Sequence, residues 1–147
     1  MNVLVDTDAL LAIVDQNDSL HQQAKALLIE LHTQGASLAL LPTTLGEFSL
    51  IAANRVGLDH TKAVVEVWTE GASHQVLEIN QNLIESALKL FHQQTSKEES
   101  LFDCFVMAAA KKHNFDAIFS FDHGYKKQIN DGLNLKLVSE LFPNITW

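Results

Sequence analysis

The sequence predicts an α/β fold, in which helices cover both faces of a central, mostly parallel sheet of about five strands to give a three-layer sandwich. Segments with the pattern of strands alternate along the chain with segments of helical periodicity, as is typical of parallel sheets with crossover helices. The expected strands are almost entirely apolar, which is the pattern of a sheet buried on both faces. The 147 residues suit one domain, so we expect a single domain spanning residues 1–147.

The chain is expected to open with a strand and two helices. Val3 to Val5 is short, apolar and rich in β-branched residues, and a helical pattern through Val14 follows it. Asp18 or Ser19 is expected to cap the second helix, because short polar side chains accept hydrogen bonds from the first backbone N–H groups of a helix. Gly35 is expected to end that helix.

The middle of the chain predicts a second strand and two further helices. Residues 38–41 read as a buried strand that Pro42 stops, because proline lacks a backbone donor. A helix is expected to begin at Thr43 or Thr44, and another follows the break at Gly57.

The second half of the chain continues the alternation. Its expected elements, in order, are a strand at 75–79, a helix with its apolar stripe at 83–91, a helix at 101–113, a strand at 117–121 and a short strand at 135–138. We find no internal repeat and no linker, so the elements belong to one domain.

Composition limits the classes of function. Apolar residues make up 47% and charged residues 19%, which is typical of a globular soluble protein. No apolar run reaches the roughly 20 residues of a membrane span, and the start does not resemble a signal peptide, so we expect a cytoplasmic protein without a membrane partner. A net charge of -8 argues against generic, high-affinity nucleic-acid binding, but not against a nuclease whose metal ions supply positive charge.

Four acidic residues stand at the boundaries of expected elements and are our candidates for a functional site. Asp6 and Asp122 directly follow apolar strands, and Glu47 and Asp103 lie in the first turns of helices. In doubly wound sheets, ligands bind beyond the carboxyl ends of the strands. Because gathered carboxylates are costly without a positive partner, we expect a divalent cation there, and its oxygen ligands favour Mg²⁺ (or Mn²⁺).

Each of these acids also has a purely structural interpretation. Asp6 and Asp122 could be N-caps. The segment from Thr44 to Glu47 matches a capping box, and the segment from Ser100 to Asp103 is a weaker version of one. Capping alone does not require an acid at all four places, since Ser, Thr or Asn would serve equally.

Together these segments resemble the PIN-domain ribonucleases, which include the VapC-like toxins of bacterial toxin–antitoxin pairs. The resemblance runs over nearly the whole chain. It rests on the opening strand and acid (Val3 to Leu11), a helix start (Asp18 to Ala24), the segment of the second acid (Pro42 to Glu47), the helix of the third (Leu101 to Ala110) and the closing strand with Ser120, the fourth acid and an aromatic residue (Phe119 to Tyr125).

The resemblance implies a PIN-like fold and a metal-dependent endoribonuclease that hydrolyses RNA phosphodiester bonds, as the toxin component of a toxin–antitoxin pair. It implies that Asp6 and Asp103 are the principal metal ligands and that Glu47 and Asp122 complete the catalytic site. The resemblance also implies a homodimer and an antitoxin partner, with the early helices forming the contact in each case. Asp8 departs from the family, which more often has Ser, Thr or Asn there, and adds a fifth carboxylate.

Two other functions compete with this one. A non-catalytic PIN-like module would bind protein or RNA without cutting it. A phosphatase of the haloacid-dehalogenase type would use Asp6 as nucleophile and Asp8 as acid/base, because Asp6-Thr7-Asp8 follows an apolar strand. The phosphatase interpretation gives Glu47 and Asp103 no role.

Overall fold

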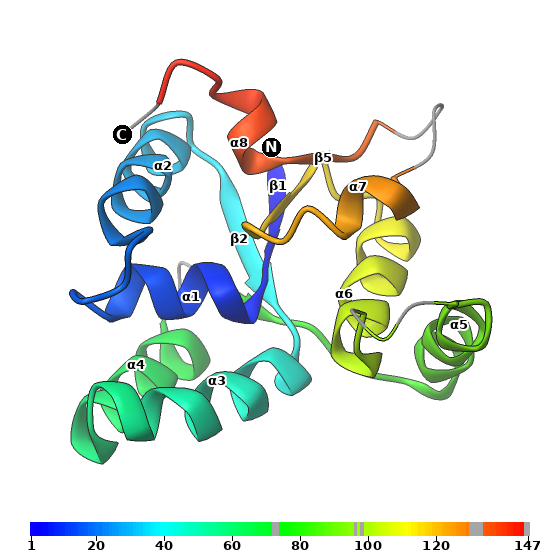
Figure 1. Cartoon of the computed structure of the whole chain (residues 1–147), viewed down its shortest axis with the longest axis horizontal. Coiled ribbons are helices and arrows are strands. Elements are labelled where there is room, and N and C mark those ends of the chain that lie inside the picture. Colours follow the sequence, from blue (N-terminus) through cyan, green and yellow to red (C-terminus); the bar gives the residue numbers. More distant parts are fainter. Residues whose placement is uncertain (72–73, 96, 98, 130–133, 146–147) are drawn as a thin grey trace.

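A parallel sheet forms the centre of the computed structural model, which describes residues 1–71, 74–95, 97, 99–129 and 134–145 (Figure 1). Within these residues the sheet has five strands in the order β3-β2-β1-β4-β5. All four neighbouring pairs are parallel. The strands are β1 (Asn2–Val5), β2 (Ser37–Leu40), β3 (His74–Val76), β4 (Ala117–Phe119) and β5 (Lys136–Leu137).

Helices cover both faces of the sheet, so the three-layer sandwich predicted from the sequence is confirmed. One face carries α1 (Thr7–Val14), α2 (His21–Thr33), α3 (Pro42–Arg55), α4 (Leu58–Glu70) and α8 (Val138–Leu141). The other carries α5 (Gln81–His92), α6 (Leu101–Lys112) and α7 (Tyr125–Gln128). None of the described helices is long and apolar enough to cross a membrane.

The central strand β1 divides its side chains between the two layers of core. Val3 and Val5 pack with the helices of the first face, whereas Leu4 packs with those of the second. This division follows from the two-residue repeat of a strand, whose successive side chains point to opposite faces. It explains why the strand contains no exposed polar positions between residues 3 and 5.

The order of the strands reverses beside β1. The chain passes from β1 to β2 and β3 on one side, and then returns to place β4 and β5 on the other. The switch point therefore lies between β1 and β4, and a crevice is expected beyond their carboxyl ends. In Figure 1 these ends point toward the bottom of the view, between α1 and α3 on the left and α6 on the right.

Two strands are shorter at their carboxyl ends than the sequence predicted. β4 ends at Phe119 rather than Phe121, because the backbone N–H of Phe121 donates to Asp8 Oδ2 at 2.8 Å instead of to a neighbouring strand. β3 ends at Val76 rather than at residue 79, and the chain then turns toward Asn80, whose side chain caps α5.

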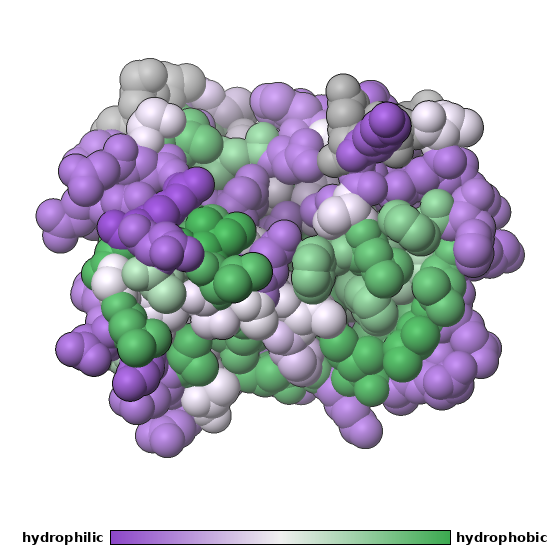
Figure 2. Space-filling model, turned by 60° about the horizontal axis from the view of Figure 1, so that its bottom comes forward, coloured by the Kyte–Doolittle hydropathy of each residue, from purple (hydrophilic) through white to green (hydrophobic). Residues whose placement is uncertain are grey.

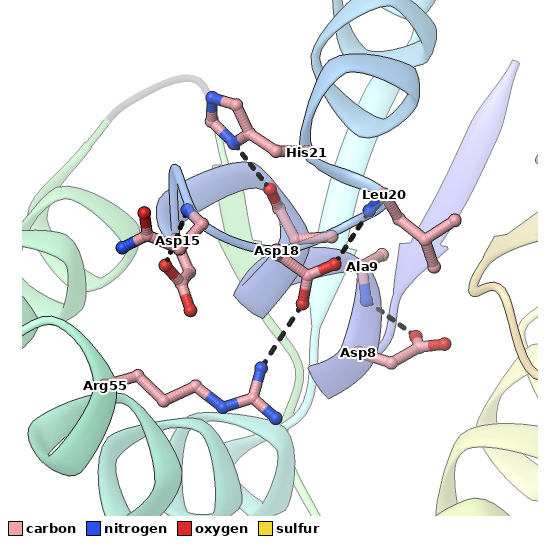
Figure 3. Close-up of polar contacts among 9 residues, drawn as sticks. Asp8, Ala9, Asp15, Asp18, Leu20, His21 and Arg55 are labelled. Carbon is pink, nitrogen blue, oxygen red and sulfur yellow. Dashed lines mark hydrogen bonds and ion pairs between the residues drawn. The ribbon is translucent and has the colours of Figure 1, made fainter. Parts of the chain in front are cut away.

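The predicted starts of two helices were wrong. Neither Asp18 nor Ser19 caps α2, whose N-cap is Leu20. Asp18 instead accepts from the N–H of Leu20 at 2.9 Å and forms a 3.2 Å ion pair with Arg55, which ties the turn before α2 to the end of α3 (Figure 3). Helix α3 begins at Pro42 itself, where the missing N–H is not needed for the helix.

Candidate active site

Asp6 lies at the switch point, between β1 and α1. It is only 5% exposed and is the N-cap of α1, as the structural interpretation predicted. Its Oδ1 accepts from the N–H of Thr7 at 2.7 Å, and its Oδ2 accepts from the hydroxyl of Tyr125 at 2.7 Å. Both carboxylate oxygens are therefore held in fixed directions.

Asp103 approaches the same tyrosine from α6. The Tyr125 hydroxyl lies 3.3 Å from Asp103 Oδ1, so its single proton faces two carboxylates, with the shorter contact to Asp6. The other oxygen of Asp103 completes the predicted capping box, because it accepts from the N–H of Ser100 at 2.6 Å and from its hydroxyl at 2.8 Å. The third acid of the sequence is thus brought next to the first.

Glu47 joins this group through Thr7. The Thr7 hydroxyl donates to Glu47 Oε2 at 2.6 Å, while the Thr7 N–H donates to Asp6. The predicted capping box from Thr44 to Glu47 is not formed, because α3 begins earlier and has Leu41 as its N-cap. A continuous run of contacts therefore connects Glu47, Thr7, Asp6, Tyr125 and Asp103.

Asp122 lies beside this network and not within it. It is exposed, and its Oδ1 accepts from the N–H of Gly124 at 2.7 Å. It does not cap a helix, since Gly124 is the N-cap of α7. Its own N–H donates to the Ser120 hydroxyl at 3.0 Å, and that hydroxyl donates to Asp8 Oδ2 at 3.1 Å. The fourth acid is therefore connected to Asp8, not directly to Asp6.

Asp8, the extra carboxylate of the sequence, fastens α1 to the segment after β4. Its Oδ2 accepts from the Ser120 hydroxyl and from the N–H of Phe121, and its Oδ1 accepts from the N–H of Ala9 at 2.6 Å (Figure 3). These contacts hold the segment after β4 against the first turn of α1, next to the switch point. They give Asp8 a structural task that the sequence did not reveal.

The gathered acids change one another's proton affinity. The pKa of Asp6 is raised to about 7, mainly by burial and further by the charges of Asp8 and Asp103, while the hydrogen bonds from Tyr125 and Thr7 act in the opposite direction. Burial likewise raises the pKa of Asp8. Burial and the neighbouring carboxylates raise the pKa of Tyr125 well above its usual value, so its hydroxyl keeps its proton at neutral pH and acts as a donor.

These side chains suit a divalent cation in donor type. All are carboxylate oxygens, and the ion pairs among the described residues, Arg55 with Asp18 and Lys126 with Glu140, lie outside the group. Within the described ranges, no three Asp, Glu, His or Cys side chains already converge closely enough to hold a metal ion. Binding would therefore require the acidic side chains to draw together around the cation.

Sequence reasoning missed two residues of this network, Thr7 and Tyr125. Thr7 is buried and contacts two candidate acids, yet in the sequence it is only a small polar residue after Asp6. Tyr125 was noted only as an aromatic residue near Asp122. A signal was present, because it is the single tyrosine of a chain that has eight phenylalanines.

Comparisons with known proteins place the chain among related sequences and folds. A family model described as "PIN domain" matches residues 3–129. The toxin VapC20 of Mycobacterium tuberculosis, described as cleaving the sarcin–ricin loop, has a similar fold, with a TM-score of 0.77 and 19% identity over 88% of this chain and 96% of that chain.

Two structures of FitB-type proteins are also similar in fold. FitAcB from Neisseria gonorrhoeae has a TM-score of 0.56 and 17% identity, over 83% of this chain and 88% of that chain. The FitAB complex bound to an IR36 DNA fragment has a TM-score of 0.55 and 16% identity, over 83% and 86%. No curated protein sequence matches the chain significantly.

Proposed function

Since this chain belongs to the PIN-domain family, as its sequence motifs predicted, we propose that it is a metal-dependent endoribonuclease that hydrolyses RNA phosphodiester bonds. The observation that carries the proposal is the contact network at the carboxyl ends of β1 and β4. It brings Asp6, Asp103 and Glu47 together from three segments of the chain, with Asp122 beside them. Asp6 is buried and Glu47 and Asp103 are half-buried, and the ion pairs among the described residues lie elsewhere, so a bound cation would offset the repulsion among these acids.

Each acid has a proposed role. Asp6 and Asp103 are the principal ligands of Mg²⁺ or Mn²⁺, because both lie at the switch point in contact with the same hydroxyl, that of Tyr125. Glu47 and Asp122 complete the site, either directly or through water. The bound cation would supply the positive charge that polarises the phosphoryl group, activates water and stabilises the leaving oxygen.

The other residues of the network hold the acids in place. Thr7 fixes Glu47 against α1, and Ser120 orders the segment that carries Asp122. Asp8 fastens that segment through Ser120 and Phe121, which does not favour its role as the acid/base of a phosphatase. An RNA substrate is supported by the similar fold of VapC20, a toxin that cleaves the sarcin–ricin loop.

Cleavage of labelled RNA tests the proposal. The wild type should cut RNA with Mg²⁺ or Mn²⁺ and not with EDTA, and Asp6→Asn and Asp103→Asn should each abolish cutting. Asp18→Asn is the matched control, because it makes the same chemical change at an acid that pairs with Arg55 away from the site. Metal-dependent cleavage that survives both site substitutions would refute the proposed site.

Two measurements separate the competing functions. A non-catalytic PIN-like module would bind RNA or protein and show no metal binding by calorimetry. A phosphatase with Asp6 as nucleophile would release phosphate from a small phosphate ester and be captured by beryllium fluoride. RNA cleavage with metal binding, without phosphate release and without capture by beryllium fluoride, supports the ribonuclease.

We also propose that the protein is a toxin neutralised by an antitoxin. An apolar groove of about 310 Å³ lies between α1 and α4 and suits the apolar face of a partner helix; Leu10, Ile13, Val64, Val67 and Trp68 are among its lining residues. The net charge of -8 favours a basic partner. Val67→Glu should weaken binding of the product of a neighbouring small reading frame, whereas Glu66→Gln, one position away, should not.

A homodimer is proposed from the family resemblance and from exposed apolar side chains. Figure 2 shows such side chains gathered in two areas, over α3 and α4 on one side and over α5 and α6 on the other. The exposed fraction is 72% for Leu50 and 57% for Leu58. Sedimentation should give twice the chain mass, and Leu50→Glu should shift it to the monomer.

A further inference from the structure

Among the residues that the structure describes, the hydroxyl of Tyr125 contacts both principal acids. It donates to Asp6 Oδ2 at 2.7 Å and lies 3.3 Å from Asp103 Oδ1. Asp6 follows β1 and Asp103 lies in α6, so the tyrosine connects segments almost a hundred residues apart in the sequence. Its position makes it a candidate for controlling how these acids face each other.

The phenol is held rigidly where it meets the acids. Tyr125 is 1% exposed and belongs to the core cluster that includes Cys104 and Met107 of α6. A ring that served only to fill this core would not need a hydroxyl, and burying a hydroxyl without a partner is destabilising. Here its partners are the two carboxylates, so the hydroxyl serves the acidic site.

The contact leaves room for a cation on the same acids. Each carboxylate oxygen can accept about two hydrogen bonds or metal contacts. In Asp6, Oδ1 accepts once from Thr7 and Oδ2 once from Tyr125, so each oxygen retains capacity for a ligand bond. In Asp103, Oδ1 has only the longer Tyr125 contact, while Oδ2 is engaged by Ser100. The hydroxyl can therefore orient both carboxylates without occupying all their acceptor sites.

We propose that Tyr125 is a positioning residue that holds Asp6 and Asp103 in the orientation required to bind the divalent cation. The inference rests on the proposed function, because it assigns Tyr125 to the metal site of that function. Its action is through the acids, and its own oxygen is not a ligand. Hydrogen bonds of this outer kind fix the direction of metal-binding side chains, and their loss commonly reduces metal affinity about 10–100-fold.

Tyr125→Phe removes the hydroxyl and keeps the ring. Titration with Mn²⁺ in the calorimeter, without RNA, should show binding that is at least about 10-fold weaker than in the wild type. Thr61→Val is the matched control, because it removes another buried hydroxyl, which donates to the carbonyl oxygen of Gly57, the N-cap of α4, away from the acids. Its Mn²⁺ affinity should equal that of the wild type.

A second measurement needs no substitution. Tyr125 is the only tyrosine, so wild-type protein labelled at the tyrosine hydroxyl-bearing carbon gives one resonance. Mg²⁺ should shift this resonance with the midpoint found by calorimetry, and Mn²⁺ should broaden it. The inference predicts these changes for the wild-type protein, so the measurement tests it even if Tyr125→Phe folds poorly.

The outcomes distinguish this inference from the proposed function. If the wild type binds Mn²⁺ and Tyr125→Phe binds equally or more tightly, the inference is wrong while the metal site stands. An unmoved tyrosine resonance at saturating Mg²⁺ also overturns the inference alone. If the wild type binds neither ion, both fail.

Discussion

The inner and outer acids of the site are held in different ways. In the inner pair, Asp6 is the N-cap of α1 and Asp103 completes the capping box of α6 whose N-cap is Ser100, and the two acids meet at the Tyr125 hydroxyl. The outer pair, Glu47 and Asp122, caps no helix and is connected to the rest through the hydroxyls of Thr7 and Ser120. Capping and the proposed metal binding, which looked like alternatives in the sequence, are therefore compatible at the inner acids.

The coincidence has a physical reason. The first turn of a helix exposes backbone donors and a positive end of the dipole, which favour a carboxylate there. A cap also fixes one carboxylate oxygen and leaves the other to point outward. Two helices that begin at the same sheet edge thus deliver two oriented acids, whereas the outer acids depend on single side-chain contacts.

The largest expected effect separates the two pairs by activity. Asp6→Asn or Asp103→Asn should reduce RNA cleavage by at least about 1,000-fold, because a principal ligand should matter more than the 10–100-fold typical of outer contacts. Glu47→Gln and Asp122→Asn should each cost only about 10-fold at saturating metal. Initial cleavage rates measure this, and equal losses at all four positions would remove the distinction between the pairs.

The next effect concerns pH and stability without metal. Because the pKa of Asp6 is raised from 3.8 to about 7 in the fold, the folded state binds the proton more tightly than the unfolded chain. Stability contributed by the protonated acid is complete below about pH 4 and is lost as the pH rises through about 7, by roughly 4 kcal/mol over that range. Urea unfolding at pH 5 and pH 8 in EDTA measures this fall.

Asp6→Asn provides the control for that measurement. The amide cannot ionise, so its stability should change less between the two pH values and should exceed that of the wild type at pH 8. Saturating Mg²⁺ should restore the wild type and leave the variant unchanged. A wild type that is more stable at pH 8 than at pH 5 in EDTA would contradict the assignment.

A smaller effect tests how the outer pair is held. Thr7→Val removes the hydroxyl that bonds Glu47 and keeps the backbone N–H that bonds Asp6. We expect a loss of about 1 kcal/mol of stability and a cleavage rate close to that of Glu47→Gln. In the double variant, which combines Thr7→Val with Glu47→Gln, the two losses in cleavage rate should not add, because both substitutions remove the same contact. Full additivity would show that Thr7 does not act on Glu47.

The smallest effect concerns Asp122. A Cβ added at Gly124 would lie 3.0 Å from Asp122 Oδ1, so Gly124→Ala should push that carboxylate aside. Because Asp122 is exposed and can move, thermal unfolding should reveal a loss of no more than about 1 kcal/mol. Gly46→Ala is the control, since a Cβ there meets no heavy atom within 4 Å. A loss well above about 1 kcal/mol would show that Asp122 is held rigidly, contrary to its place in the outer pair.

Regular periodicity is what made the fold predictable from the sequence. The apolar runs of β1 and β4 and the helical stripes of α2 and α5 give distinct patterns, and their alternation requires a parallel sheet. Helix α8 has four residues, too few for a helical stripe, and was missed, whereas a helix was expected after Asp122 but begins at Tyr125 with Gly124 as its N-cap. The start of α2 was misplaced because Asp18 bonds to a residue 37 positions away, which no local pattern records.

The site was predictable in its residue types but not in its contacts. Acids that follow strands share one sheet edge, so their approximate meeting place follows from topology. The bonds from Thr7 to Glu47 and from Tyr125 to Asp6 span 40 and 119 positions, and they depend on side-chain directions that only the packed structure fixes. The role of Asp8 was hidden for the same reason.

The central place of β1 has a consequence for synthesis on the ribosome. The strand β1, which is made before the other four strands of the sheet, needs β4, more than a hundred residues later, as one of its two neighbours, and Asp6 meets Tyr125 later still. Such distant pairing makes folding slow and delays it until most of the chain has emerged. An incomplete chain therefore has no assembled acidic site, and a nuclease built in this way would be harmless to the ribosome that produces it until synthesis is almost finished.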